Sequence, residues 1–252
     1  MKKKYHHSED EHNLTAPREI VPEILKLLEI KSVVDIGCGI GTFLHCFKEN
    51  GIEEVLGIDG KWVNKNLLYK YISPQEFKEV DLEENFDLIK KYDLAISLEV
   101  AEHLSEKSAD IFIRNLISAG KVILFAAAIP LQGGQNHINE QWLTYWEKKF
   151  LKYDYVIHDI LRPIFWDNPN IFTWYKQNMV LVTPRNFKFD TEPIYNPLRN
   201  IVHYDLYMNK AKQCNDAIKG ELSPLKYLGY LAISIIGRNN LKKIGRMLTK
   251  KN

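Results

Sequence analysis

The chain has 252 residues and a formal net charge of +2, and 45% of its residues are hydrophobic. This size favours one α/β domain with an extension over two full domains. The near-neutral charge excludes an overall basic excess that would by itself indicate a nucleic acid or membrane partner. Three cysteines form no CxxC pair, and the first residues lack the apolar stretch of a secretory signal, so we expect a cytoplasmic protein.

Short apolar runs alternate with helical patterns along most of the chain. The helical patterns predict helices over residues 22–30, 42–49, 105–119 and 140–150. The apolar runs predict seven strands, over residues 32–37, 55–59, 77–81, 93–98, 122–129, 155–160 and 178–182. This alternation indicates a mostly parallel sheet with helices on both faces. The last two strands, joined by a loop of residues 162–177, could add an antiparallel edge.

The character of the chain changes near its end, so we expect one domain over residues 1–197 and an extension over residues 198–252. Residues 225–237 are apolar, and residues 238–251 carry six basic side chains and no acidic one. One interpretation is a helix packed on the domain with a solvated tail, which we favour. The other is a basic amphipathic helix, residues 225–251, in peripheral contact with an anionic membrane.

A glycine-rich turn, VVDIGCGIGTFL, joins the first of these strands to the helix that follows it. Gly37, Gly39 and Gly41 let the backbone turn tightly and approach a ligand. Their spacing differs from the dinucleotide fingerprint, which has its third glycine three residues after the second. Asp35 lies just before the turn, where a carboxylate would repel a pyrophosphate but suit a ligand that carries an ammonium group.

Two further acids end the next two strands. Asp59 is placed where a carboxylate accepts both hydroxyl protons of a ribose, and Asp81 is placed for an adenine amino group, with Leu82 beside the ring. Either acid alone could be an ordinary turn residue that follows a strand. Acids at three successive strand ends, together with the glycine turn, indicate a nucleoside ligand. Trp62 suits stacking on the adenine and simple packing equally.

These motifs resemble, in the right order, those of the class I S-adenosylmethionine (SAM)-dependent methyltransferases. VVDIGCGIGTFL resembles their first motif, GIDG their acidic second-strand motif and VDL their adenine-contact motif. YDLAISLEVAEHL is similar to the fourth-strand motif of ubiquinone-pathway and saccharide O-methyltransferases. The resemblance covers about residues 14–185. It implies an α/β fold with a doubly wound, Rossmann-like sheet of seven strands, one of them reversed, to which the chain adds a helical extension.

The resemblance also implies SAM as the cofactor and a role for individual residues. The three glycines would line the methionine part, Asp59 would bind the ribose, and Asp81 with Leu82 would meet the adenine. The full set of expected cofactor-binding residues is Asp35, Gly37, Gly39, Gly41, Asp59, Trp62, Asp81, Leu82 and Leu98.

The fourth strand runs into Glu99, Glu102 and His103, which are costly to bury without partners. If a helix begins directly after the first of them, their spacing places all three on one face. A second polar segment, residues 130–142 (PLQGGQNHINEQW), follows the fifth strand. Because both segments open on the carboxyl edge of the sheet, His137 can approach the first cluster.

Two chemistries suit this cluster. In one, His137 or His103 is the general base toward an acceptor hydroxyl, with Glu99 as a further catalytic candidate. In the other, a divalent cation (Mg, Mn, Fe or Zn) makes the hydroxyl acidic. The pattern E-x-x-E-H with a distant histidine resembles the metal set of the small-RNA 3′-end 2′-O-methyltransferases. The metal ligands would then be Glu99, Glu102, His103 and His137. A competing interpretation is that the acids only cap the start of a helix.

Aromatic and polar residues downstream indicate a lid or groove for a sugar ring or a base. They are Trp142, Tyr145, Trp146, Arg162, Trp166, Trp174, Tyr175 and Asn178. Trp146 and Phe150 also fit the core stripe of one helix. Arg162 suits a phosphate on the acceptor or an ion pair with Asp159 or Asp167.

The sequence thus predicts a SAM-dependent O-methyltransferase that acts on a hydroxyl of a saccharide or sugar-containing metabolite, as in glycan biosynthesis. RNA 2′-O-methylation is an alternative, although no basic stripe crosses the catalytic half. Methylation of a quinone or phenol is another, favoured by the membrane-seeking tail. Outside enzymes, the alternative is a catalytically silent cofactor-binding scaffold, against which the polar cluster argues.

Overall fold

The computed structural model describes residues 5, 7–10, 12–189 and 199–218. These residues fall into two units, one that ends at His203 and one that begins at Tyr204. The second unit contains helix α8 (Tyr204–Ile218), so the expected C-terminal extension is helical there. The expected boundary after residue 197, the apolar residues 225–237 and the basic residues 238–251 lie outside the described residues. Among the described helices, none is both long enough and apolar enough to cross a bilayer.

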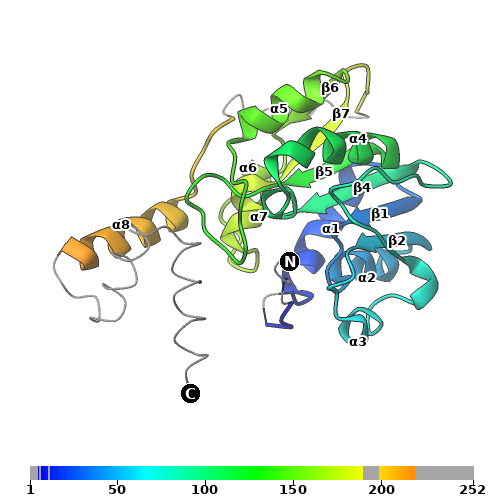
Figure 1. The fold of residues 1–252 in the computed structure, drawn as a ribbon, viewed down its shortest axis with the longest axis horizontal. Helices are drawn as coiled ribbons and strands as arrows, with labels where there is room; N and C mark the ends of the chain where they lie inside the picture. The colour runs from blue at the N-terminus through cyan, green and yellow to red at the C-terminus, as the bar shows by residue number, and fades with distance from the viewer. Residues whose placement is uncertain (1–4, 6, 11, 190–198, 219–252) are drawn as a thin grey trace, which may run out of the picture. The chain divides into compact units, whose positions relative to one another are not determined.

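Seven strands form one sheet with the order β3-β2-β1-β4-β5-β7-β6 (Figure 1). Strands β1 to β5 run parallel to one another, and β7 is antiparallel to both β5 and β6. The mostly parallel sheet with one reversed strand and the antiparallel edge are therefore confirmed. The strands are β1 (Ser32–Ile36), β2 (Glu54–Asp59), β3 (Phe77–Glu79), β4 (Tyr92–Leu98), β5 (Gly120–Ala126), β6 (Tyr155–His158) and β7 (Val180–Pro184).

Helices cover both faces of the sheet, as Figure 1 shows. They are α1 (Thr15–Leu27), α2 (Thr42–Glu49), α3 (Lys65–Leu68), α4 (Ala109–Ala119), α5 (Leu143–Leu151), α6 (Arg162–Phe165) and α7 (Thr173–Asn178). Short 3-10 turns are η1 (Pro74–Glu76), η2 (Ala101–His103) and η3 (Glu106–Ser108).

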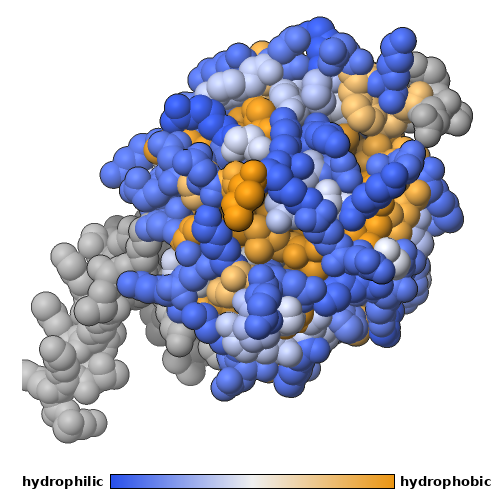
Figure 2. Space-filling model, turned by 90° about the vertical axis from the view of Figure 1, so that its right-hand side faces the viewer, coloured by the Kyte–Doolittle hydropathy of each residue, from blue (hydrophilic) through white to orange (hydrophobic). Residues whose placement is uncertain are grey.

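The apolar strands are buried on both sides because two hydrophobic cores flank the sheet. Val33 packs in the core that contains α1 and α2, whereas its neighbour Val34 packs in the core that contains α4 and α5. Successive side chains of a strand point to opposite faces, which explains why β1 is a continuous apolar run. On the face shown in Figure 2, hydrophilic residues dominate and hydrophobic residues reach the surface in patches between them.

The first helix and the loop after β6 differ from the prediction. Helix α1 begins at Thr15 and carries Pro22 inside it, whereas the sequence predicted a start at that proline. Ala16 and Ile20 are buried and extend the apolar stripe of the helix toward its start. The predicted loop of residues 162–177 contains two short helices, α6 and α7, and α7 continues to Asn178.

Candidate active site

The carboxyl ends of β1, β2 and β4 meet at one edge of the sheet. Asp35 on β1 lies opposite Gly57 on β2 and opposite Ile96 on β4. The chain leaves β1 into the glycine turn and leaves β4 toward Glu99. The fold therefore brings the glycine turn and the polar residues after β4 to the same edge, as the sequence predicted.

The glycine turn requires backbone conformations that other residues rarely adopt. Gly37, Gly39 and Gly41 have φ angles of +89°, +55° and +84°. A Cβ atom on Gly37 would collide with the side chain of Val100, which follows β4. The turn thus packs directly against the segment that carries the two glutamates, so a ligand on the turn lies beside them.

Asp59 ties the end of β2 to the glycine turn. Its Oδ2 accepts a hydrogen bond from the Gly39 amide at 2.9 Å, and its Oδ1 accepts one from the Gly60 amide at 2.6 Å. Only 4% of Asp59 and 5% of Asp35 is exposed. Burial raises the pKa of Asp35 to about 8, with the Asp59 carboxylate adding to the effect, and burial raises the pKa of Asp59 to about 6.

Two buried acids beside a glycine turn suit a cationic ligand. A positive charge on the ligand favours the ionised carboxylates that burial alone disfavours. SAM carries an ammonium and a sulfonium group, so the residues present fit this cofactor.

The other predicted cofactor residues lie around this edge. The ring of Trp62 packs over Gly60, next to Asp59. Asp81 is exposed after β3, whereas Leu82 is buried in the core and Leu98 is half-buried at the end of β4. Their roles toward the cofactor stay predictions.

The segment directly after β4 is not the start of a regular helix, which was the condition for placing Glu99, Glu102 and His103 on one helical face. Glu99 has a left-handed backbone with a φ of +57°, and the next turn, η2, is a 3-10 helix of three residues. The Glu99 amide continues the ladder of β4 and β5 by donating to the Ala126 carbonyl at 2.9 Å. Glu99, Glu102 and His103 therefore do not share a helical face and meet through a tight turn instead.

Glu102, His103 and His137 form a compact donor set. Each offers one ligand atom, and these atoms lie within 4.8 Å of one another. Glu102 is fully buried, and neither of its carboxylate oxygens has a hydrogen-bond partner, nor has Nδ1 of His103. Nε2 of His137 lies 3.9 Å from Oε1 of Glu102. Buried polar atoms without partners are costly, and a divalent cation is one group that would satisfy all three residues.

The loop of residues 130–142 is fastened to this donor set. The amides of Ile138 and Asn139 both donate to the Glu102 carbonyl, at 2.9 and 3.0 Å. Nδ1 of His137 lies 2.9 Å from Oε1 of Glu140. A carboxylate that accepts Nδ1–H leaves Nε2 of the imidazole as the ligand atom toward Glu102. Sequence reasoning missed Glu140, although its position three residues after His137 in a polar loop is a usable signal.

Glu99 is held differently from the other three predicted metal ligands. Its Oε2 accepts from the Gln132 side-chain amide at 2.7 Å, and its Oε1 accepts from the Asn178 side-chain amide at 2.9 Å. Glu99 is not part of the compact donor set, and its role as a ligand or catalytic residue stays a prediction. Gln132 is a second residue that sequence reasoning missed, because it points back to β4 only in the folded loop.

Burial also controls the charge of this cluster. Burial raises the pKa of Glu102 well above its ordinary value, and the nearby Glu99 carboxylate adds to it. Burial raises the pKa of Glu99 itself to about 7. Burial lowers the pKa of His103 to about 4, with the His137 imidazole adding to the effect. Without a cation, burial therefore favours the protonated form of Glu102, and His103 is neutral at pH 7.

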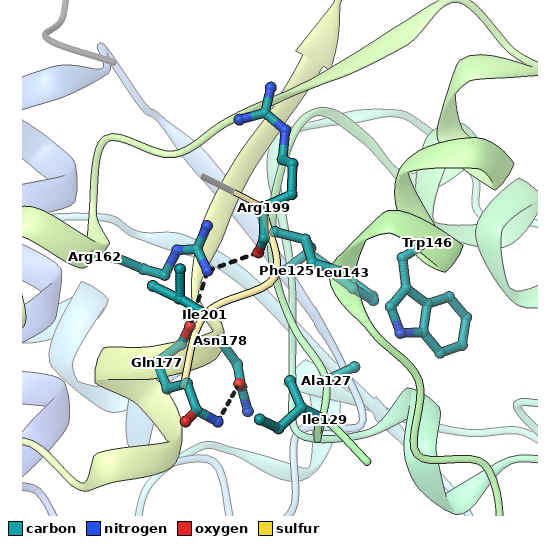
Figure 3. A pocket seen from close by; sticks show the side chains of 10 residues that line it. All are labelled: Phe125, Ala127, Ile129, Leu143, Trp146, Arg162, Gln177, Asn178, Arg199 and Ile201. Carbon is teal, nitrogen blue, oxygen red and sulfur yellow. Dashed lines mark hydrogen bonds between the residues drawn. The ribbon is translucent and has the colours of Figure 1, made fainter. Parts of the chain in front are cut away.

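Several downstream residues turn out to be structural. Trp146 and Phe150 are buried in the core, as the alternative interpretation held. Arg162 forms a buried two-bond ion pair with Asp159, at 2.7 and 2.6 Å, which is one of the two interpretations of that arginine. Figure 3 shows Arg162 with Gln177 and Asn178 beside a small cavity of about 10 Å³, which has room for roughly one water molecule.

Comparison with known proteins decides the family. A family model described as a methyltransferase domain matches residues 9–163, which is more than half of the chain. The chain belongs to this methyltransferase family. The match includes the glycine turn, both buried acids and the whole Glu102–His103–His137 set. The predicted enzyme class is thus confirmed, and SAM is the methyl donor that the family uses.

Solved structures share the fold at low sequence identity. PKMT2 from Rickettsia typhi is 14% identical, with a TM-score of 0.52, and the match covers 72% of this chain and 55% of that one. The methyltransferase domain of bacterial CtHen1-C is 20% identical, with a TM-score of 0.49, and the match covers 68% of this chain and 99% of that one. A comparison with curated proteins found no match.

Proposed function

We propose that this SAM-dependent methyltransferase methylates a hydroxyl of a saccharide or sugar-containing metabolite. We propose further that Glu102, His103 and His137 hold a divalent cation at the acceptor. The observation that carries the proposal is the fully buried Glu102 carboxylate, which has no hydrogen-bond partner and lies among two imidazoles.

The donor set limits the metal and the acceptor. Two imidazoles with one carboxylate suit Mn, Fe or Zn better than Mg, which prefers oxygen ligands. A bound cation would lower the pKa of an acceptor hydroxyl and orient a neighbouring hydroxyl, as two adjacent groups of a sugar require. The chain's own part is to position the acceptor beside the methyl group, because methyl transfer needs close, in-line geometry.

The loop that carries His137 also supports a sugar acceptor. Leu131, Ile138 and Trp142 are large apolar residues of this loop, and 82%, 67% and 37% of them, respectively, is exposed. Apolar and aromatic side chains pack against the C–H face of a sugar ring while its hydroxyls point elsewhere. An RNA acceptor would call for a basic surface to contact phosphates, which a chain with a net charge of +2 does not favour.

A transfer assay with a panel of acceptors tests this proposal. Metal-stripped protein receives SAM with a deuterated methyl group, then Mn²⁺, Zn²⁺ or Mg²⁺, and one acceptor: a methyl glycoside, a nucleotide sugar, a short RNA or a catechol. Mass spectrometry then reports any labelled product. We expect label on a sugar only when a cation is present.

Matched variants locate the requirement. We expect Glu102→Gln to abolish transfer, because an amide is a poor cation ligand, and we expect Glu106→Gln, an exposed glutamate four residues on, to leave it unchanged. Transfer that is unaffected by a chelator would contradict the metal proposal. Label on RNA or catechol alone would contradict the sugar. SAM binding without transfer to any acceptor would favour a silent scaffold.

A further inference from the structure

Tyr5 and His7, two described residues near the start of the chain, lie against the active site. The described residues of this N-terminal segment are Tyr5, residues 7–10 and His12. An ion pair between Glu9 and Lys70, with Nζ and Oε1 2.7 Å apart, fastens the segment to the connection between β2 and β3. The His12 amide donates to the Ser8 carbonyl at 3.0 Å and closes a turn within the segment.

His7 packs on the middle glycine of the turn. If Gly39 carried a Cβ atom, that atom would lie 2.8 Å from Nε2 of His7. Because Gly39 has no side chain, the imidazole of His7 can pack directly against its backbone. The same glycine donates its amide to Asp59, so Gly39 is next to both His7 and the predicted ribose-binding carboxylate.

The segment continues from the glycine turn to the candidate metal ligands through ring contacts. The rings of His7 and Tyr5 have centroids 4.7 Å apart, those of Tyr5 and His103 are 4.9 Å apart, and those of His103 and His137 are 4.8 Å apart. Tyr5 and His103 meet edge to face, a favourable arrangement for aromatic pairs. These contacts connect the glycine turn to the candidate metal ligands Glu102, His103 and His137.

We propose that Tyr5 and His7 form a wall of the SAM-binding site and that His7 binds the amino-acid half of SAM. Asp59 lies on the β2 side of Gly39, whereas the row from His7 to Tyr5 and His103 runs to the β4 side. If the ribose of SAM lies at Asp59 and its methyl group faces Glu102, His103 and His137, then its methionine part lies next to His7. An imidazole N–H there donates to the methionine carboxylate, which the two buried acids of the site cannot do.

This proposal rests on SAM as the donor and not on the nature of the acceptor or the metal. Binding of two ligands therefore tests it without any transfer. S-adenosylhomocysteine carries the amino-acid half, and 5′-methylthioadenosine has the same nucleoside and sulfur but lacks that half. Calorimetry measures both on the full chain with its natural residues and on His7→Ala, His7→Gln and Asp10→Asn. Asp10 is an exposed acid of the same segment and provides the matched control.

The two ligands should respond differently. We expect His7→Ala to weaken S-adenosylhomocysteine binding about tenfold or more, as loss of a hydrogen bond to a charged group does, and to leave 5′-methylthioadenosine binding unchanged. His7→Gln keeps an N–H donor and should recover part of the loss, and Asp10→Asn should change neither affinity. Equal losses for both ligands in His7→Ala would reduce His7 to a structural role and overturn the proposal. Unchanged or tighter binding of S-adenosylhomocysteine would overturn it too. Unchanged binding would mean that His7 does not contact the ligand, and tighter binding would mean that His7 blocks the site.

Discussion

Asp35→Asn separates the stability of the ligand-free protein from its affinity for SAM. The Asp35 carboxyl is buried at the end of β1, and its pKa is raised from 3.8 to about 8. Asparagine has nearly the same shape and carries no charge at any pH. The substitution therefore removes the titration of this site while it keeps the packing around the glycine turn.

The sign of the pH dependence follows from the raised pKa. The folded state holds the Asp35 proton more tightly than the unfolded chain, so this group contributes full stability below about pH 4. That contribution is lost as the pH rises toward about 8. Between the ordinary pKa of 3.8 and pH 7 this loss of stability accumulates over about three pH units, which corresponds to roughly 4 kcal/mol. Because Asp59 shares part of this effect, we expect Asp35→Asn to be more stable than the natural protein by about 2–4 kcal/mol at pH 7.

Urea unfolding of the ligand-free protein at several pH values between 4 and 8 measures this difference. The two proteins should have equal stability near pH 4 and diverge as the pH rises. In the same variant, binding of SAM, whose cationic groups favour an ionised Asp35, should weaken about tenfold or more. Parallel stability curves for the two proteins across this pH range would refute the reasoning.

Three other predictions concern the glycine turn, the buried ion pair and the metal. Gly37→Ala should lower the free energy of unfolding by about 1–3 kcal/mol, measured in urea, because its left-handed φ and the contact with Val100 leave no room for a Cβ. Asp159→Asn should cost about 3–5 kcal/mol in the same assay, because it leaves the buried Arg162 charge uncompensated. Mn²⁺ should raise the melting temperature of the natural protein but not of Glu102→Gln. Its affinity should fall as the pH falls, because protons compete with the cation for Glu102, whose pKa burial raises. Equal responses of both proteins to Mn²⁺ would contradict this last expectation.

Much of the sheet could be predicted from the sequence because its strands are short apolar runs bounded by acids or glycine. Helix α1 was placed too late, since Pro22 suits the first turn of a helix and also fits inside this one. The short helices α6 and α7 were missed because aromatic residues at close spacing carry no clear period.

The site residues that the strand order brings together could be predicted from the sequence. Those whose position depends on local backbone conformation could not. The ends of parallel neighbouring strands must meet, so Asp35, Asp59 and the residues after β4 could be placed together. The left-handed conformation of Glu99 could not be foreseen, because a non-glycine residue rarely adopts it and a continuing helix is the ordinary expectation. The contacts of Tyr5 and His7 were equally hidden, since nothing in a short polar segment indicates which distant ring or glycine it will cover.

The central claim is that Glu102, His103 and His137 hold a divalent cation beside the methyl donor. Crystals of the protein with S-adenosylhomocysteine and Mn²⁺, with diffraction recorded on both sides of the manganese absorption edge, test it most directly. We predict one anomalous peak within bonding distance of a Glu102 oxygen and of a nitrogen on each histidine. Bound S-adenosylhomocysteine with no manganese peak among these three side chains would contradict the claim.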